Sequence, residues 1–347
     1  MTEVGDTGES RIARRVVRID GNRCVHGALA IARCRACADA CPVHAIALTN
    51  ESLSVTAAAC TGCGLCRPAC PEEAIEIAGA SFVPLISSRD NVAYVACEKV
   101  EAEGAPGVIP CLQALAKADI EKLARENVLR LVTTCGDCEV CMPGSHGRFE
   151  TLIALTNKVE TSRGAGNMIH EPIEPLDWRR RRSAVLASRS DLDQGRRGLF
   201  SFILSARSGD GPRDAVATSG TAPGPAIERL YHYVPKIDGE RCSGCDACIR
   251  ICRHGALSLL SSDGGLAYRI DAEACTGCRL CVDICEDGAM SVTAAAASGE
   301  PNLALVEARC RGCGAPFHRP AVQGEAPPLC RICQRTDHHR KLHQVRP

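Results

Sequence analysis

Short runs in which apolar and polar residues alternate occur in two separate stretches of the chain. The first stretch contains AIAL, LSVT and AIEI, beginning at residues 45, 53 and 74, and the second contains ALSLL, LAYRID and AMSVT, beginning at residues 256, 266 and 289. Alternation with a period of two is typical of short, half-buried β-strands. The pattern therefore predicts two similar small regions, each built from short strands and tight loops.

A different pattern lies between these regions. NVAYVAC from residue 91 and NVLRLVTTC from residue 127 read as buried strands, and LQALAKADIEKLAREN from residue 112 has apolar positions at helical spacing. The order strand, helix, strand predicts a small α/β domain over residues 81–175. Residues 176–232 contain the basic run WRRRR and then a Gly-, Pro-, Ser- and Ala-rich segment, which predicts a linker.

Cysteine usage adds chemistry to this pattern. The chain has 347 residues and 25 cysteines, with no basic start followed by an apolar secretion signal and no apolar run near the ~20 residues that span a bilayer. We expect a cytoplasmic protein in a reducing compartment, where clustered cysteines usually bind metal. The formal net charge of zero argues against nucleic acid as a partner, and no glycine-rich nucleotide motif is present.

Sixteen of the cysteines form four blocks. Three blocks have the spacing C-x2-C-x2-C-x3-C, and the block that comes first in the chain is stretched to C-x9-C-x2-C-x3-C. Three thiolates on one tight loop and a fourth from a remote motif are the ligands of a cubane iron–sulfur cluster. The spacing therefore favours 4Fe–4S clusters over zinc or unligated thiols.

With these motifs, residues 15–80 and 233–296 each resemble the bacterial-type two-cluster 4Fe–4S ferredoxin family, so that the chain resembles a polyferredoxin. The resemblance implies an α+β protein in which two ferredoxin-like modules, in segments 1–80 and 233–296, flank the α/β domain. It also implies four clusters, each held by one of four crossed sets of cysteines. The first set is Cys24, Cys34, Cys37 and Cys70; the second is Cys60, Cys63, Cys66 and Cys41; the third is Cys242, Cys245, Cys248 and Cys285; the fourth is Cys275, Cys278, Cys281 and Cys252.

Two departures from that family pattern affect the expected sites. The insertion after Cys24 leaves the first set less securely assigned, and we expect His26 inside it to be a solvated loop residue. Arg253 and Glu286 stand where the family has proline. Because a nearby cation favours the more negative, reduced cluster, we expect the fourth-set cluster beside Arg253 to have a higher potential than the third-set cluster beside Glu286.

Five further cysteines lie in the α/β domain, at or after the ends of its predicted elements. They are Cys97, Cys111, Cys135, Cys138 and Cys141. Strand ends on one side of an α/β sheet can converge on one site, so a fifth iron–sulfur centre, buried unligated thiols and a dithiol redox pair all remain open. The pattern resembles the small cysteine-rich subunit that links hydrogenases to heterodisulfide reductases.

The tail, residues 297–347, contains the spacing C-x2-C-x16-C-x2-C at Cys310, Cys313, Cys330 and Cys333. This spacing is typical of a zinc ribbon, in which four thiolates hold one zinc ion and the metal supplies the folding energy of a segment with little core. A rubredoxin-like iron site is the alternative.

The sequence contains no recognisable catalytic constellation, and we therefore expect an electron-transfer protein or subunit more than an enzyme. Clusters of this kind carry single electrons, and typical hosts are formate dehydrogenase, hydrogenase and molybdopterin reductase systems. Two other functions remain open. One is an assembly or redox-sensing factor for a metalloenzyme, and the other is an enzyme that uses the middle cysteines. The electron donor and acceptor are not identifiable from the sequence.

Overall fold

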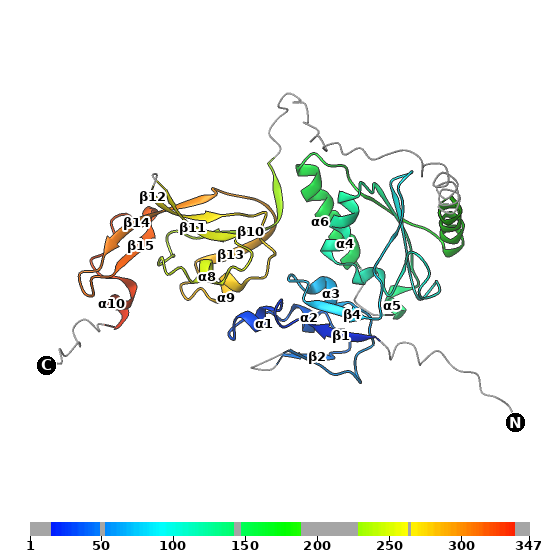
Figure 1. Cartoon of the computed structure of the whole chain (residues 1–347), viewed down its shortest axis with the longest axis horizontal. Coiled ribbons are helices and arrows are strands. Elements are labelled where there is room, and N and C mark those ends of the chain that lie inside the picture. Colours follow the sequence, from blue (N-terminus) through cyan, green and yellow to red (C-terminus); the bar gives the residue numbers. More distant parts are fainter. Residues whose placement is uncertain (1–14, 49–52, 142–146, 189–227, 263–264, 337–347) are drawn as a thin grey trace, which may run out of the picture. The chain divides into compact units, whose positions relative to one another are not determined.

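The computed structural model describes residues 15–48, 53–141, 147–188, 228–262 and 265–336 (Figure 1). The chain divides into two compact units. One comprises Met1–Gly79, Ala154–Ala165 and Arg229–Pro347, and the other comprises Ala80–Ile153 and Gly166–Glu228. In the parts of the chain that are described, no helix has the length and apolar character needed to cross a membrane.

The first module of unit one is formed by two antiparallel strand pairs and three single-turn helices. Strands β1 (Val16–Ile19) and β4 (Ile75–Ala78) pair with each other, as do β2 (Ile46–Leu48) and β3 (Leu53–Val55). Helices α1 (Val25–Ala28), α2 (Ala36–Asp39) and α3 (Cys66–Ala69) each contain or adjoin a cysteine of the motifs. The three strands predicted here are confirmed, whereas β1 was not predicted because its VVRI run is short and follows a basic segment.

The second module repeats this arrangement. Strand β10 (Leu230–Ile237) pairs with β13 (Met290–Ala297), and β11 (Leu257–Ser262) forms an antiparallel pair with β12 (Gly265–Ile270). Helices α8 (Ala247–Ile251) and α9 (Leu280–Asp283) follow the two cysteine loops. In both modules the outer strands pair with each other, so the loop after the first strand lies beside the loop before the last one.

The tail continues the sheet of the second module. Strand β14 (Asn302–Arg309) pairs with β12, and β15 (Pro316–Pro320) pairs with β14, which gives the strand order β11-β12-β14-β15. The short η4 (Ala321–Gln323) and α10 (Arg331–Thr336) follow. The tail therefore shares backbone hydrogen bonds with the second module.

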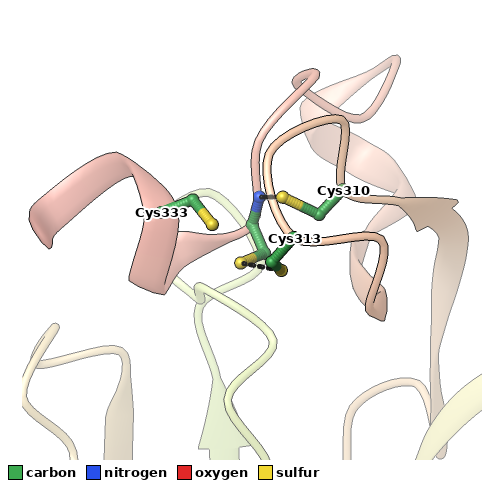
Figure 2. Close-up of side chains that lie close together, drawn as sticks. Cys310, Cys313 and Cys333 are labelled. Carbon is green, nitrogen blue, oxygen red and sulfur yellow. Dashed lines mark hydrogen bonds between the residues drawn. The ribbon is translucent and has the colours of Figure 1, made fainter. Parts of the chain in front are cut away.

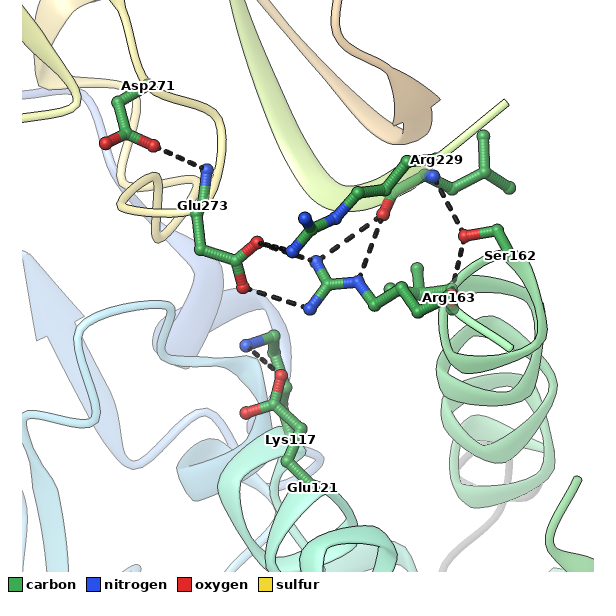
Figure 3. A network of polar contacts seen from close by, with 9 residues as sticks. Lys117, Glu121, Ser162, Arg163, Arg229, Asp271 and Glu273 are labelled. Carbon is green, nitrogen blue, oxygen red and sulfur yellow. Dashed lines mark hydrogen bonds and ion pairs between the residues drawn. The ribbon is translucent and has the colours of Figure 1, made fainter. Parts of the chain in front are cut away.

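A polar network fixes the start of the second module (Figure 3). Arg163 binds both carboxylate oxygens of Glu273 at 3.0 and 3.1 Å, and Arg229 binds the same carboxylate at 3.0 Å. The backbone N–H of Leu230 donates to Ser162 Oγ at 2.8 Å, which holds the first residue of β10 against the end of α6 (Arg148–Ser162).

The second unit is a five-stranded sheet with apolar cover on both faces. Its strands are β5 (Leu85–Ser87), β6 (Val92–Cys97), β7 (Val108–Ile109), β8 (Arg130–Thr134) and β9 (Ile169–Pro172), and its helical segments include η3 (Leu112–Ala114), α4 (Lys117–Arg125) and α5 (Cys138–Cys141). An ion pair between Lys117 and Glu121 at 2.6 Å spans one turn of α4 (Figure 3). Strand β6 runs parallel to β7 and β8, and β8 runs parallel to β9.

Alternate residues of β6 face opposite layers, as expected for a strand buried on both sides. Ala93 and Val95 belong to a core that includes residues of α4, whereas Tyr94 belongs to a core that includes Trp178. Both of the strands predicted for this domain, and the helical segment between them, are confirmed.

Trp178 lies on a helix over residues 175–188, where the sequence predicted the start of a linker. The indole ring is fully buried, and the arginines after it are bound within this unit. Arg179 pairs with Glu101 at 2.5 Å, Arg181 pairs with Glu171 at 2.8 Å, and Arg182 donates to the carbonyl oxygen of Pro106 at 3.0 Å. The basic run is therefore part of the α/β domain. Of the rest of the predicted linker, residues 189–227 lie outside the described residues, and residues 230–232 belong to β10.

Candidate metal centres

Three pockets in unit one are each lined by one complete set of four cysteines. The pocket of the first set has Ile19, Val25 and Leu53 among its apolar walls, and His26 and Glu72 also line it. The pockets of the third and fourth sets have Met290 and Leu257, respectively, among theirs. The paired outer strands cause this convergence, because they bring the last cysteine of one motif to the loop of the other.

The titration behaviour of the thiols also reflects these sets. For one thiol in each set, burial is the largest effect on the pKa and neighbouring thiols are the next, because desolvation and mutual repulsion both disfavour the thiolate. In the first module, the pKa of Cys37 rises to about 11 beside Cys34, Cys70 and Cys24, and the pKa of Cys66 rises to about 12 beside Cys63, Cys37 and Cys41. In the second module, the pKa of Cys248 rises to about 12 beside Cys242, Cys245 and Cys285. The pKa of Cys281 also rises to about 12, beside Cys278, Cys275, Cys248 and Cys252. Cys60 is half-buried but is not among these neighbours.

Backbone N–H groups donate to the last cysteine of three blocks. The donors are Ala45 to Cys41 at 3.2 Å, Ala74 to Cys70 at 3.3 Å and Ala289 to Cys285 at 3.2 Å. In each case the residue before the donor has a positive φ, which turns the chain back over the sulfur. Such bonds favour negative charge on sulfur and are one of the means by which proteins tune cluster potential.

The separation of the sulfur atoms distinguishes two kinds of site. Within the described ranges, the tail cysteines are the group whose ligand atoms all lie within 4.8 Å of one another. The cysteines of the first, third and fourth sets instead line pockets, which fits a cluster of several iron atoms better than a single ion. The donor chemistry, four thiols with an apolar wall and backbone N–H groups, fits 4Fe–4S clusters.

A buried carboxylate joins the two modules of unit one. Glu72, which follows the first module's Cys70 and Pro71, is 6% exposed. It accepts hydrogen bonds from His254 Nε2 at 2.9 and 3.1 Å and from Thr276 Oγ1 at 2.5 Å, both in the second module. In another hydrogen bond between the two modules, the backbone N–H of Arg33 donates to Asp283 Oδ2 at 2.9 Å.

The same contact contains an apolar cluster. Val25 and Ala32 of the first module pack with Leu280 of the second, and Cys34 and Cys278 lie against this cluster. The first and fourth cysteine sets therefore face each other across the module contact. The sequence did not predict this contact, because Glu72 has the appearance of an ordinary acidic loop residue and its partners lie 182 and 204 positions away.

One expectation about the residues near the clusters is wrong, and two charged residues there have partners that the sequence did not predict. His26 is half-buried instead of solvated, and its Nε2–H donates to the carbonyl oxygen of Cys34 at 2.8 Å. Arg253 donates to the carbonyl oxygen of Cys24 at 3.2 Å and lies 3.9 Å from the Glu72 carboxylate, so its charge is not isolated. Glu286 is paired with Arg335 at 2.6 Å. The expected difference in potential stays a prediction, in which the partner of each residue offsets part of its charge.

The middle cysteines gather at one edge of the second unit's sheet. Cys97 ends β6, Cys135 directly follows β8, and Cys111 follows β7, so all three lie at the carboxyl ends of parallel strands. Cys138 Sγ is 4.0 Å from Cys135 Sγ and interacts electrostatically with Cys97 and Cys141. Desolvation and the neighbouring thiols of Cys138 and Cys97 raise the pKa of Cys135 to about 12.

The tail cysteines form a compact group at the start of α10 and in the loop between β14 and β15 (Figure 2). Cys313 Sγ lies 3.9 Å from Cys330 Sγ. Hydrogen bonds from backbone N–H groups lower the pKa of Cys310 to about 6, and the largest effect comes from the N–H of Cys330, with a smaller one from that of Gly312. Burial raises the pKa of Cys333. Four sulfur atoms within 4.8 Å of one another fit one tetrahedral ion.

Comparison with known families agrees with the chemistry of the ferredoxin motifs. The chain is an iron–sulfur protein of mixed helices and strands that contains a ferredoxin-type 4Fe–4S domain. Residues 241–289 match the family model of a 4Fe–4S dicluster domain, and residues 32–81 match that of an LdpA Fe–S cluster-binding domain. The first match spans all eight second-module cysteines, whereas the other begins after Cys24. None of the curated proteins matches the chain.

Proposed function

We propose that this protein relays single electrons through four 4Fe–4S clusters held by the four cysteine sets. The observation that carries the proposal is that three pockets are each lined by all four cysteines of one crossed set. When bound, each cluster supplies a site that stores and releases one electron.

The chain's own residues give each site its properties. Apolar walls such as Ile19 and Met290 keep water away from the clusters, which lowers the reorganisation that accompanies a change in charge. The N–H donors at Ala45, Ala74 and Ala289 stabilise negative charge on the thiolates. The thiols must lose protons that burial makes them retain, so loading each set releases protons.

The order of the sites follows from their neighbours. Within the first module, Cys66 of the second set interacts with Cys37 of the first. Within the second module, Cys281 of the fourth set interacts with Cys248 of the third. Since the first and fourth sets face each other at the module contact, we propose the order second, first, fourth, third.

Two other metal sites complete the proposal. The convergence of Cys97, Cys135, Cys138 and Cys141 supports an additional iron–sulfur centre in the second unit, with Cys111 at the same sheet edge. Among the described residues, the sulfur atoms of the tail cysteines all lie within 4.8 Å of one another, whereas those of the middle cysteines do not. We assign one zinc ion to the compact tail site.

We further propose that the relay serves a cytoplasmic oxidoreductase, of the formate dehydrogenase, hydrogenase or molybdopterin reductase kind, which provides the substrate chemistry. The three pockets described at the cysteine sets are lined mainly by thiols and apolar side chains. They offer no arrangement for binding and converting an organic substrate, and this favours a relay over an enzyme.

Electron counting tests the proposal. The anaerobic, iron-loaded chain should take up about four electrons from a one-electron reductant at the four ferredoxin-type sites, and return them to a one-electron acceptor. The Cys135→Ser/Cys138→Ser variant separates these electrons from those of a middle-domain centre. A loaded chain that accepts about two electrons or fewer would show that the sets do not act as four separate carriers.

A further inference from the structure

The tail is docked onto the loop that carries most of the third cysteine set. Gln323 Nε2 donates to the carbonyl oxygens of Gly239 at 2.5 Å and Cys242 at 2.8 Å. His318 Nε2 donates to Asp246 Oδ1 at 2.8 Å, and Asp246 stands between Cys245 and Cys248. The tail therefore contacts this loop at its beginning and at its middle.

Two glycines of the second module make this close approach feasible. Gly244, with φ +70°, has so little space that a Cβ atom would overlap the carbonyl oxygen of His318. At Gly239 a Cβ atom would lie 2.7 Å from Val322 Cγ1. At Gly244 a side chain would meet the backbone of the tail, and at Gly239 a side chain would require Val322 to move, so the tail lies directly on the backbone of the loop.

The tail also places a cation beside the third set. Arg335 lies on α10, two residues after Cys333, and pairs with Glu286 at 2.6 Å and Asp287 at 3.1 Å, directly after the third-set ligand Cys285. It also interacts electrostatically with Cys245. Arg335 is about half exposed and Glu286 more so, and exposed pairs of this kind contribute little to stability. A charge so close to a cluster nevertheless favours its reduced state.

We propose that the tail metal site sets the reduction potential of the third-set cluster by holding Arg335 against it. This inference rests on the proposed function. Helix α10 has six residues, too few to be stable alone, and it contains the ligand Cys333 and directly follows Cys330. A metal ion bound by these cysteines fixes the helix and thereby the guanidinium, which offsets the negative charges of Glu286 and Asp287.

The test measures cluster potentials in the full chain, loaded with iron and zinc, by redox titration followed with EPR spectroscopy. The signal of the third-set cluster is assigned from its loss in Cys245→Ser. Arg335→Gln should lower the potential of this cluster and leave the other three unchanged. Arg331→Gln is the matched control, because Arg331 lies one turn earlier on α10 and is not part of the ion pair with Glu286 and Asp287.

A second variant tests the metal itself. Cys313→Ser, at the exposed tail ligand, should lower the same potential with unchanged iron content, and a Cys313→Ser/Arg335→Gln double variant should lower it no further than either change alone. If all four clusters are present and neither variant shifts the third potential, or if all four potentials shift equally, the inference is wrong. Absence of the third signal from the parent chain would instead contradict the proposed function.

Discussion

Replacement of Glu72 by alanine should loosen the contact between the two modules of unit one. The substitution removes the acceptor of the hydrogen bonds from His254 and Thr276 and leaves the Arg253 guanidinium without its nearest carboxylate. Because Glu72 is 6% exposed, water cannot readily replace these bonds. The expected effect is therefore larger than that of a surface ion pair.

The magnitude follows from the partners. Hydrogen bonds to a charged group contribute about 1.5–3 kcal/mol each, and loss of one partner of a buried ion pair costs about 3–5 kcal/mol. The His254 side chain is one-third exposed and Arg253 lies at 3.9 Å, so both contributions are reduced. We expect a loss of about 3 kcal/mol in the free energy of opening the contact, which corresponds to roughly a 100-fold change.

Hydrogen exchange measured by mass spectrometry reports this opening directly. The Arg33 amide is bonded to Asp283 of the other module, so its exchange follows separation of the modules. Glu73→Ala is the control, because Glu73 is half exposed and pairs only with exposed Arg23, at 3.4 Å, among the ion pairs described. If exchange at Arg33 is unchanged in Glu72→Ala, or rises equally in Glu73→Ala, the carboxylate does not hold the modules together.

Two further predictions concern the second unit. In the iron-loaded chain, iodoacetamide should fail to modify the exposed thiol of Cys141 until a chelator removes the iron, and rapid modification before chelation would mean that Cys141 is not a ligand. Burial lowers the pKa of His170 below 6.5, although Glu150 acts in the opposite direction. The unfolded state therefore binds the proton more tightly. The free energy of unfolding of this unit should keep its full value above about pH 6.5 and decrease as the pH falls below that value. Denaturation followed by the fluorescence of Trp178, the chain's single tryptophan, measures this pH dependence of the unfolding free energy. The pH dependence should be smaller in His170→Gln. An unchanged pH dependence in that variant would refute the assignment to His170.

Local features of the fold were predictable because their causes are local. Alternation in AIEI and AMSVT predicts β4 and β13, and the apolar spacing around Ile120 predicts α4. The spacing of the cysteine blocks alone indicates the iron–sulfur chemistry, since ligand geometry requires it.

The features that were not predictable depend on contacts between distant residues. Glu72 and Thr276 are 204 positions apart, and His318 meets Asp246 over 72 positions. The arginines after Trp178 have the pattern of a solvated run, but the burial of the indole ring places them next to acceptors in the same unit. Such partners are selected by packing, which a single sequence does not encode in a readable pattern.

Iron content tests the central claim of four clusters most directly. The measurement is best made on the anaerobically reconstituted Cys135→Ser/Cys138→Ser variant, in which iron bound by the middle cysteines does not contribute. Four 4Fe–4S clusters predict about 16 iron atoms and about 16 sulfide ions per chain, with zinc in the tail counted separately. A fully reconstituted variant with about eight iron atoms or fewer would contradict the assignment of the sixteen cysteines to four sets.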